Sequence, residues 1–301
     1  ETGTSVAAIA VLASVGLIGG LFTISVVAVS IAEPLDHIRA ALGRVGQGDL
    51  TADVSVDEVG EVGQVQAGFN DMVAGLRERA ELQELFSRHV GHEVAEQALA
   101  QGTGLGGEAR RASVLFVDLI GSTAMAEVLP PGEVVSTLNA FFQAVVDTVT
   151  AEGGWVNKFE GDGALCIFGV PGFQPDHEAR ALRAARRLHV ELAALREENP
   201  GLDAGIGVST GTVVAGNVGT EQRYEYTVIG RAVNEAARLT DLAKQRPRRV
   251  LASAASVRAA GEERAHWADR GRVGLRGQQQ PTAIFEPGVG SPASYASAPE
   301  A

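Results

Sequence analysis

The sequence predicts an α+β protein, in which a ferredoxin-like domain with the element order β-α-β-β-α-β follows a long apolar helix and a pair of amphipathic helices. Three observations lead to this prediction. Residues 6–31 are apolar or small throughout, residues 33–80 carry apolar residues at helical spacings, and strand and helix patterns alternate from residue 112 onward. The tail, residues 287–301, is rich in Pro, Ser, Gly and Ala and is expected to be disordered.

Residues 1–32 are predicted to form a transmembrane helix, the last span of a longer protein, since the chain does not begin with Met. No charged residue occurs between Glu1 and Glu33, and a bilayer span needs about 20 apolar residues. The segment lacks the basic start and cleavage site of a signal peptide. A buried core helix is the alternative. Arg39 and Arg44 follow the span and favour a cytoplasmic position for the rest of the chain, at the plasma membrane.

Residues 33–82 predict two short helices joined by an extended connector. Apolar residues repeat every three or four positions in both helices, which indicates a seam that packs against other helices: Leu35, Ile38, Leu42 and Val45, then Val62, Val65, Phe69, Met72 and Leu76. With Pro34, the step Gly48-Asp49-Leu50 and the opening at residues 57–61, the segment resembles a HAMP signal-relay module. That resemblance implies a parallel four-helix bundle of two chains. A generic coiled coil is the alternative, and it also implies a dimer.

Residues 83–109 predict a signalling helix, continuing to residue 100, and then a flexible linker. His89 and His92 lie one turn apart but have no third ligand near in sequence, so solvated or interface histidines are expected. Residues 102–107 match G-x-G-x-x-G, but the motif follows a helix and precedes a strand, the reverse of its context in dinucleotide sites. We therefore interpret it as part of the linker.

Residues 110–286 carry the alternating strands and helices. We expect strands at residues 113–118, 155–159, 164–168, 204–209 and 224–228, and helices at residues 133–151, 176–199 and 232–243. The turn Glu160-Gly161-Asp162-Gly163 joins two of the strands as a hairpin. Cys166, the single cysteine, permits no internal disulfide and is expected in the core.

Two motifs carry carboxylates. Asp118 ends an apolar strand and is followed by Gly121-Ser122-Thr123 at an expected helix start. A carboxylate can hold a hard cation there, and free backbone N–H groups can cradle phosphate. A plain helix cap is the alternative. Asp162 lies in the hairpin turn, where an ordinary turn residue is the alternative. If the hairpin lies beside the first strand, Asp118 and Asp162 converge, and such a pair suits Mg²⁺ or Mn²⁺.

A third motif places polar residues on one helix face. Asn234 and Arg238 are four residues apart, so they project together. An amide and a guanidinium on one face can orient a sugar and neutralise a phosphoryl transition state. An ordinary surface pair is the alternative. The formal net charge of −12 argues against nucleic acid as a partner, but it leaves a nucleotide substrate open.

Taken together, these motifs resemble the class III nucleotidyl cyclases over about residues 86–286, in particular bacterial, membrane-anchored members of actinobacterial type with a HAMP domain. The resemblance implies that Asp118, Asp162 and the carbonyl of Leu119 bind two metal ions, Mg²⁺ or Mn²⁺. It implies that Lys158 and Thr227 contact the purine, Asn234 the ribose and Arg238 the α-phosphate. It also implies a homodimer, because metal carboxylates from one chain meet the other four residues of its partner.

ATP is the expected substrate, with cyclic AMP and pyrophosphate as products. Lys158 can donate to adenine N1, and the Thr227 hydroxyl can accept from the exocyclic amine. Facing guanine, the lysine would meet the N1–H donor, a mismatch of about 1–3 kcal/mol if buried. Relatives often carry Asp where Thr227 stands, and a short polar residue where Arg231 stands. A guanylyl cyclase and a catalytically silent regulatory partner are the alternatives. Regulation through the HAMP module, by upstream membrane or sensor segments of the same protein, is a further expectation.

Overall fold

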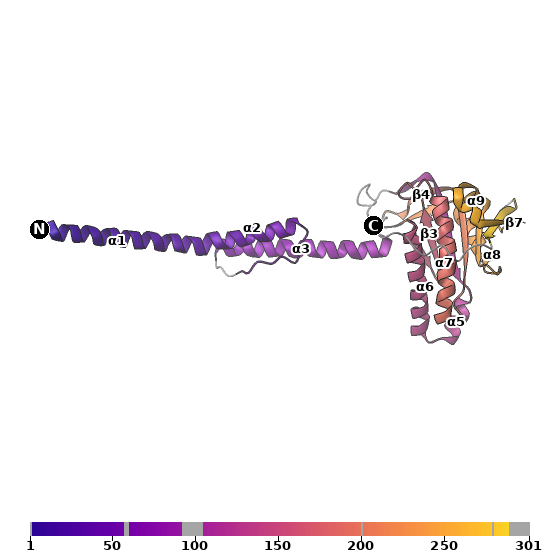
Figure 1. Ribbon diagram of the computed structural model, residues 1–301, viewed down its shortest axis with the longest axis horizontal. Coiled ribbons are helices and arrows are strands. Elements are labelled where there is room, and N and C mark those ends of the chain that lie inside the picture. Colours follow the sequence, from indigo (N-terminus) through magenta and orange to yellow (C-terminus); the bar gives the residue numbers. More distant parts are fainter. Residues whose placement is uncertain (1, 57–59, 92–104, 200, 279, 289–301) are drawn as a thin grey trace. The chain divides into compact units, whose positions relative to one another are not determined.

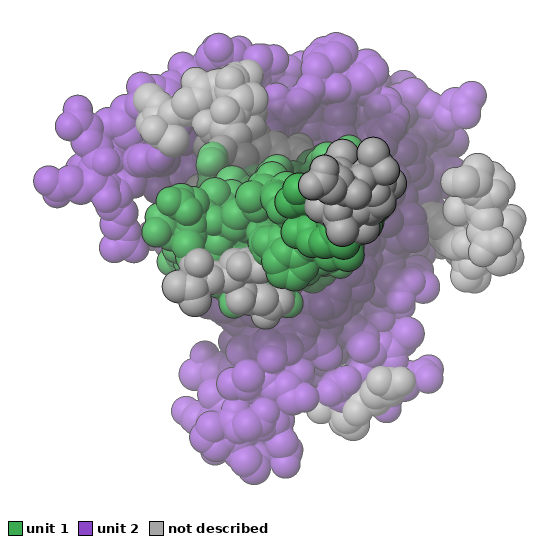
Figure 2. Space-filling view, turned by 90° about the vertical axis from the view of Figure 1, so that its left-hand side faces the viewer, with its two compact units in different colours: residues 1–86 green, residues 87–301 purple. Residues whose placement is uncertain are grey.

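The computed structural model describes residues 2–56, 60–91, 105–199, 201–278 and 280–288 (Figure 1). The chain divides into two compact units, Glu1–Phe86 and Ser87–Ala301, which Figure 2 shows in green and purple.

The first unit begins with a long helical stretch. Helix α1, Thr2–Val27, continues through a π-helical turn, Ala28–Ala32, into α2, Glu33–Gly46. The segment Ala10–Gly46 is long and apolar enough to span a membrane, with a mean hydropathy of 2.3 in its most apolar window. Pro34 is the second residue of α2 and directly follows the π-helical turn, and the helical stretch continues through it.

The helical pair of the first unit has a small core. Helix α3, Glu61–Val90, packs against α2 and the connector between them. Asn70 holds the connector by two hydrogen bonds: its Oδ1 accepts from Val54 N at 3.1 Å and its Nδ2 donates to Val54 O at 2.8 Å. The predicted seam divides, because Ile38 and Phe69 are buried but five other seam residues are exposed: Leu35, Leu42, Val65, Met72 and Leu76. Residues 57–59 lie outside the described residues.

The second unit is built on an eight-stranded sheet in the order β2-β3-β1-β4-β6-β8-β7, with β5 paired to β4. Its strands are β1 Gly106–Leu119, β2 Trp155–Glu160, β3 Gly163–Phe168, β4 Ala204–Thr220, β5 Arg223–Ile229, β6 Val250–Ser253, β7 Trp267–Val273 and β8 Thr282–Pro287. Strands β4 and β6 are parallel, whereas the other pairs are antiparallel. The predicted α+β class and the order β-α-β-β-α-β are confirmed.

Helices cover both faces of this sheet. The second unit contains α5 Ser122–Val128, α6 Pro131–Ala151, α7 His177–Glu198, α8 Arg231–Ala243 and α9 Ala254–Ala259, with a 3-10 turn at Gly261–His266. Alternate residues of β1 point to opposite faces. Leu115 and Val117 pack with α6 and α7, which lie side by side (Figure 1), whereas Val114 packs with α8. Although α6 is apolar enough to pass a length-and-composition test for a span, its Phe141 and Val145 are fully buried in this core.

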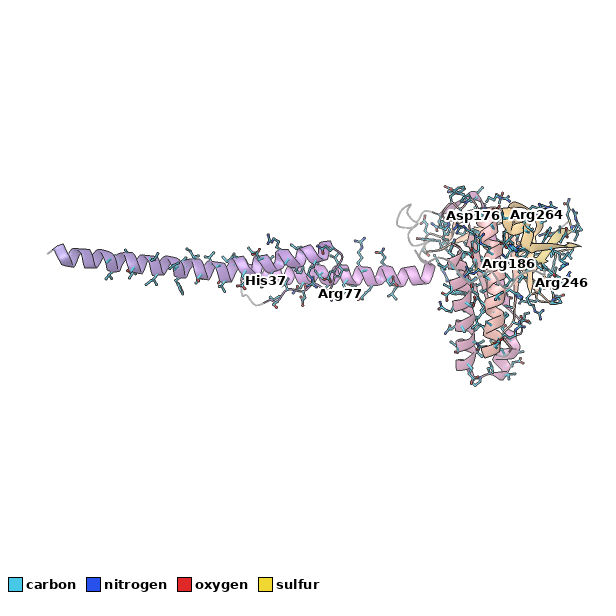
Figure 3. The ribbon with its side chains drawn as sticks, in the orientation of Figure 1. His37, Arg77, Asp176, Arg186, Arg246 and Arg264 are labelled. Atoms are coloured by element: carbon cyan, nitrogen blue, oxygen red, sulfur yellow. The ribbon has the colours of Figure 1, made fainter. Side chains whose placement is uncertain are left out.

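Two contacts fix how α7 and α8 lie. Arg186, labelled on α7 in Figure 3, makes paired bonds of 2.7 and 3.0 Å to Glu263 of the 3-10 turn. On the other face, α8 rests directly on β4, where a Cβ added to Gly207 would lie 2.3 Å from Ala236 O. Only glycine permits this approach, so α8 lies close along β4.

The linker expectation is wrong at its C-terminal end. Strand β1 begins at Gly106, and Gly106 and Gly107 pair with Asn217 and Gly216 of β4. These glycines serve close strand packing, because a Cβ added to Gly216 would lie 2.0 Å from Gly106 O. The signalling helix ends at Val90 rather than continuing unbroken to residue 100, because Gly91 leaves the helix with a positive φ of 89°. His92, the remainder of the expected helix and residues 102–104 lie outside the described residues, as does the tail from residue 289.

Candidate active site

The two candidate metal carboxylates lie at one end of the sheet. Asp118 of β1 stands opposite Gly163 of β3 in the antiparallel ladder, and Leu119 N donates to Asp162 O at 3.3 Å. A Cβ added to Gly163 would lie 2.8 Å from Asp118 Oδ1. The tight β2–β3 turn therefore brings Asp162 and Leu119 next to Asp118, as the hairpin pattern predicts, and glycine at residue 163 leaves room for the carboxylate.

Lys244 contacts Asp118, one of the two candidate carboxylates. It follows the last residue of α8, and its Nζ lies 2.5 Å from Asp118 Oδ2. Burial raises the pKa of Asp118, the Lys244 ammonium opposes that rise, and the negative charges of Asp162 and Asp241 add to it. The site thus holds three carboxylates near one ammonium ion. The sequence contained one signal for this residue, because lysine occurs at only two positions, 158 and 244.

The donor set fits a hard divalent cation. Carboxylate and backbone carbonyl oxygens are the ligands that Mg²⁺ prefers, and it is commonly held by one or two carboxylates together with substrate phosphates. Within the described part of the chain, no group of three or more His, Cys, Asp and Glu side chains is placed to hold a metal by itself. The site therefore suits a metal that arrives with a phosphate-bearing substrate.

The expected phosphate loop follows immediately. Gly121 has a positive φ of 77° and Ser122 begins the short helix α5. Met125 N donates to Gly121 O at 2.9 Å, which closes the first turn. Gly121 and Thr123 are exposed and Ser122 is half-buried, so the loop lies open to solvent beside the carboxylates.

The candidate purine residues form a second group, where β2 meets β5. The Thr227 hydroxyl donates to Asn157 Oδ1 at 2.8 Å, and Asn157 Nδ2 donates to Tyr226 O at 2.7 Å. Lys158 Nζ lies 3.3 Å from Glu225 Oε2. Because β2 pairs with β3 and β5 with β4, these side-chain contacts join two strands that belong to different ladders. Asn157 and Glu225 had no predicted role.

The candidate ribose and phosphate residues lie on the outward face of α8. Asn234 and Arg238 are both exposed, and Arg238 Nη1 lies 3.3 Å from Asp241 Oδ2. The opposite face is buried, and there Glu235 accepts from Ser209 at 2.7 Å and from Thr282 at 3.1 Å. Helix α8 therefore presents the predicted pair to solvent.

The structure brings the predicted residues together in three groups rather than one. The groups are Asp118 and Asp162 with Leu119, Lys158 with Thr227, and Asn234 with Arg238. The contacts given above link the first group to Lys244, the second to Asn157 and Glu225, and the third to Asp241. Arg231 lies at the start of α8 and its Nη2 is 3.3 Å from Gln278 Oε1. Cys166 is fully buried in β3, and burial raises the pKa of its thiol, as expected of a core residue.

Comparisons with known proteins identify the families of both parts of the chain. Residues 107–286 match the family model described as adenylate and guanylate cyclase catalytic domain, and residues 26–78 match that of the HAMP domain. Uncharacterized protein Rv1318c of Mycobacterium tuberculosis (strain ATCC 25618 / H37Rv) is 49% identical over 278 residues, 92% of this chain and 51% of that protein. The chain thus spans about half the length of such curated relatives.

Solved structures show the same fold. The guanylyl cyclase Cya2 is 33% identical, with a TM-score of 0.56, over 63% of this chain and 98% of that one. A bacterial light-regulated adenylyl cyclase superposes with a TM-score of 0.64 over 72% of this chain and 62% of that one. At 24% identity, the latter likeness concerns the fold alone.

Proposed function

The chain belongs to the class III adenylate and guanylate cyclase family and carries a HAMP domain, and on that premise we propose that it is an adenylate cyclase. It would convert ATP to 3′,5′-cyclic AMP and pyrophosphate at a site shared by two copies of the chain. The observation that carries the proposal is the meeting of Asp118, Asp162 and Leu119 at one strand end, beside an open glycine turn.

The metal site sets the chemistry. Cyclases of this class use divalent ions, generally Mg²⁺ or Mn²⁺, and we propose two per site. Bound there, the ions would lower the pKa of the ribose 3′-hydroxyl and neutralise the leaving phosphates. The residues of this chain would position them: Asp118 and Asp162 supply oxygens and the Leu119 carbonyl supplies another. Arg238 would stabilise the charge that grows on the α-phosphate in the transition state, and Asn234 would orient the ribose.

The purine group supports ATP over GTP. The Lys158 ammonium has donors only, so it complements adenine N1, which accepts, and conflicts with the N1–H of guanine. Thr227 is 7% exposed, so a mismatched polar contact there would be poorly hydrated and costly. Glu225 and Glu160, which lie 3.3 and 3.7 Å from Lys158, hold the lysine side chain at this place.

Two features support a homodimer. Asn234 and Arg238 face solvent on a helix whose other face is buried, as residues that serve a partner's site would. In the first unit, the exposed seam residues form an apolar surface that a second copy of the HAMP domain would cover. The N-terminal apolar helix supports a membrane anchor with a cytoplasmic catalytic domain, regulated through HAMP by upstream segments.

Product analysis tests the proposal. The full chain, reconstituted in lipid vesicles, is incubated with Mn²⁺ and either ATP or GTP, and cyclic nucleotides are separated by chromatography. We expect cyclic AMP in clear excess. Preferential cyclic GMP would make the chain a guanylate cyclase. The absence of both products from a dimeric, folded protein would leave a silent regulatory partner.

A further inference from the structure

We propose that Asn157 contributes to base specificity, beside Lys158, by fixing the direction of the Thr227 hydroxyl proton. The inference rests on the proposed function, in that Thr227 is the residue placed against the purine. Asn157 itself does not touch the base; it acts through Thr227 and is therefore a positioning residue.

The hydrogen-bond pattern leaves one assignment for the amide. One of the two terminal atoms of the Asn157 amide lies 2.7 Å from Tyr226 O. Because a carbonyl oxygen only accepts hydrogen bonds, this atom must be Nδ2. Its Oδ1 therefore faces the Thr227 hydroxyl at 2.8 Å, and this oxygen also only accepts. The single hydroxyl proton of Thr227 is consequently committed to Asn157.

A committed proton gives the hydroxyl a fixed polarity. Thr227 has only lone pairs left for a ligand, so it can accept a hydrogen bond but cannot donate one. Adenine presents an amino donor at its six position, whereas guanine presents a carbonyl oxygen there, which would meet lone pairs with lone pairs. A threonine with a free hydroxyl would rotate to suit either base, so the discrimination at the six position comes from Asn157.

A β-bulge puts Asn157 in place. Strand β2 pairs Val156 with Cys166 and then Lys158 with Leu165, so Asn157 is the extra residue. Successive strand residues normally point to opposite faces, and a bulge re-aims the side chain. Here it lets both Asn157 and Lys158 reach β5, at Thr227 and Glu225. One β-bulge thus places both the donor, Lys158, and the residue that orients the acceptor, Thr227, for one edge of the purine.

The test is the ratio of kcat/KM for ATP to kcat/KM for GTP in the full chain. Asn157→Leu, with Asn157→Ala as a smaller second change, removes the acceptor and should lower the ratio about tenfold or more, the size of one buried mismatch. Asn157→Asp keeps an acceptor for Thr227 and should keep the ratio, although the lost bond to Tyr226 lowers activity with both nucleotides. Asn199→Leu, on the α7 C-terminus, is the matched control and should change nothing.

A double-mutant cycle separates specificity from packing. In a Thr227→Val background, Asn157→Leu should not alter the ratio further, because no hydroxyl remains to be oriented. If the unaltered protein makes cyclic AMP but Asn157→Leu and Asn157→Ala keep its ratio within about twofold, Asn157 has no such role while the adenylate assignment stands. Equal loss of the ratio in Asn157→Asp and Asn157→Leu would also overturn the inference. Preferential cyclic GMP from the unaltered protein would instead overturn the proposed function.

Discussion

The ammonium nitrogen of Lys244 lies 2.5 Å from Oδ2 of Asp118, so the C-terminal end of α8 contacts the end of β1. A glycine makes the path for this side chain. A Cβ added to Gly205 of β4 would lie 2.6 Å from Lys244 Cγ. The aliphatic part of the Lys244 side chain therefore packs directly against the backbone of Gly205. In the absence of a metal ion, the carboxylate at the centre of the candidate site has this ammonium as its counterion.

Replacing Lys244 by Met should destabilise the metal-free protein and change its response to Mg²⁺. Removing one partner of a partly buried ion pair leaves Asp118 unpaired, at a cost of about 1–3 kcal/mol. Added Mg²⁺ should stabilise the variant more than the unaltered protein, because no ammonium competes for Asp118. Thermal unfolding with and without Mg²⁺ measures both effects.

Arginine at the same position provides the control. Lys244→Arg keeps the positive charge, so its unfolding temperature and its Mg²⁺ response should both lie closer to those of the unaltered protein than those of Lys244→Met do. An identical unfolding temperature and an identical Mg²⁺ response in Lys244→Met would show that the contact with Asp118 has no energetic weight.

Gly163→Ala should impair catalysis while the domain stays folded. The added Cβ would lie 2.8 Å from Asp118 Oδ1 and 3.0 Å from Val117 O, so the Asp118 carboxylate must move away from its position beside Asp162. Since small displacements of positioned groups are costly, we expect kcat to fall about 100-fold. Gly172→Ala, where an added Cβ meets nothing within 4 Å, should keep full activity. Steady-state kinetics with Mn-ATP, together with circular dichroism, checks both variants.

Local patterns predicted the parts of the site that lie within one segment. The β2–β3 turn is short, so a hairpin pattern suffices to place Asp162 beside a neighbouring strand, and helical spacing suffices to put Asn234 and Arg238 on one face. The buried strands and the core position of Cys166 also follow from composition alone.

Lys244 and Asn157 could not be predicted because their roles depend on distant or irregular geometry. Lys244 reaches Asp118 only because glycines of β4 admit α8 closely, a tertiary contact that periodicity does not contain. Asn157 faces β5 because of a β-bulge, whereas strict alternation along β2 predicts the opposite direction for its side chain. The linker interpretation of Gly106 and Gly107 is wrong for a similar reason: both glycines pair with β4, and a glycine-rich composition does not distinguish close strand pairing from a flexible linker.

His177 should make the second unit less stable at mildly acidic pH. It is 6% exposed, and its Nδ1 lies 2.8 Å from Ser113 Oγ. Burial lowers its pKa from the usual 6.5, the nearby Glu178 opposes that shift, and Arg111 adds to it. A histidine whose folded pKa is depressed stabilises the fold above its unfolded pKa, and that stability is lost as the pH falls from about 6.5 toward the folded value.

The measurement is urea unfolding of the protein between pH 7.5 and pH 5, followed by a spectroscopic signal from the second unit. The unaltered protein should lose stability below about pH 6.5, by up to about 1.4 kcal/mol per pH unit. His177→Gln cannot take up this proton, so its stability should fall less over the same range. Burial also lowers the pKa of His189, but His189 is present in both proteins and its contribution cancels in the difference. Parallel pH profiles would exclude His177 as the titrating group.

Mixing two inactive variants should restore partial activity, because each proposed shared site would draw the carboxylates from one chain and the base-contacting residues from the other. Asp118→Ala removes a proposed metal ligand and Lys158→Ala removes the proposed purine donor, so neither homodimer would have an intact site. A heterodimer has one site that carries both defects and one that carries neither. Random pairing at equal concentrations makes half of the dimers mixed, with one of two sites intact, so about a quarter of the original activity is expected.

The control is a double variant, with both changes in one chain, mixed with the unaltered chain. In each mixed dimer of this control, both sites carry one defect. Its mixed dimers should therefore contribute nothing, although the singly changed pair does. Heterodimers are verified by two affinity tags. If tagged heterodimers of the single variants form and still make no cyclic AMP, the proposal that one chain supplies the carboxylates and its partner supplies the purine residues is wrong.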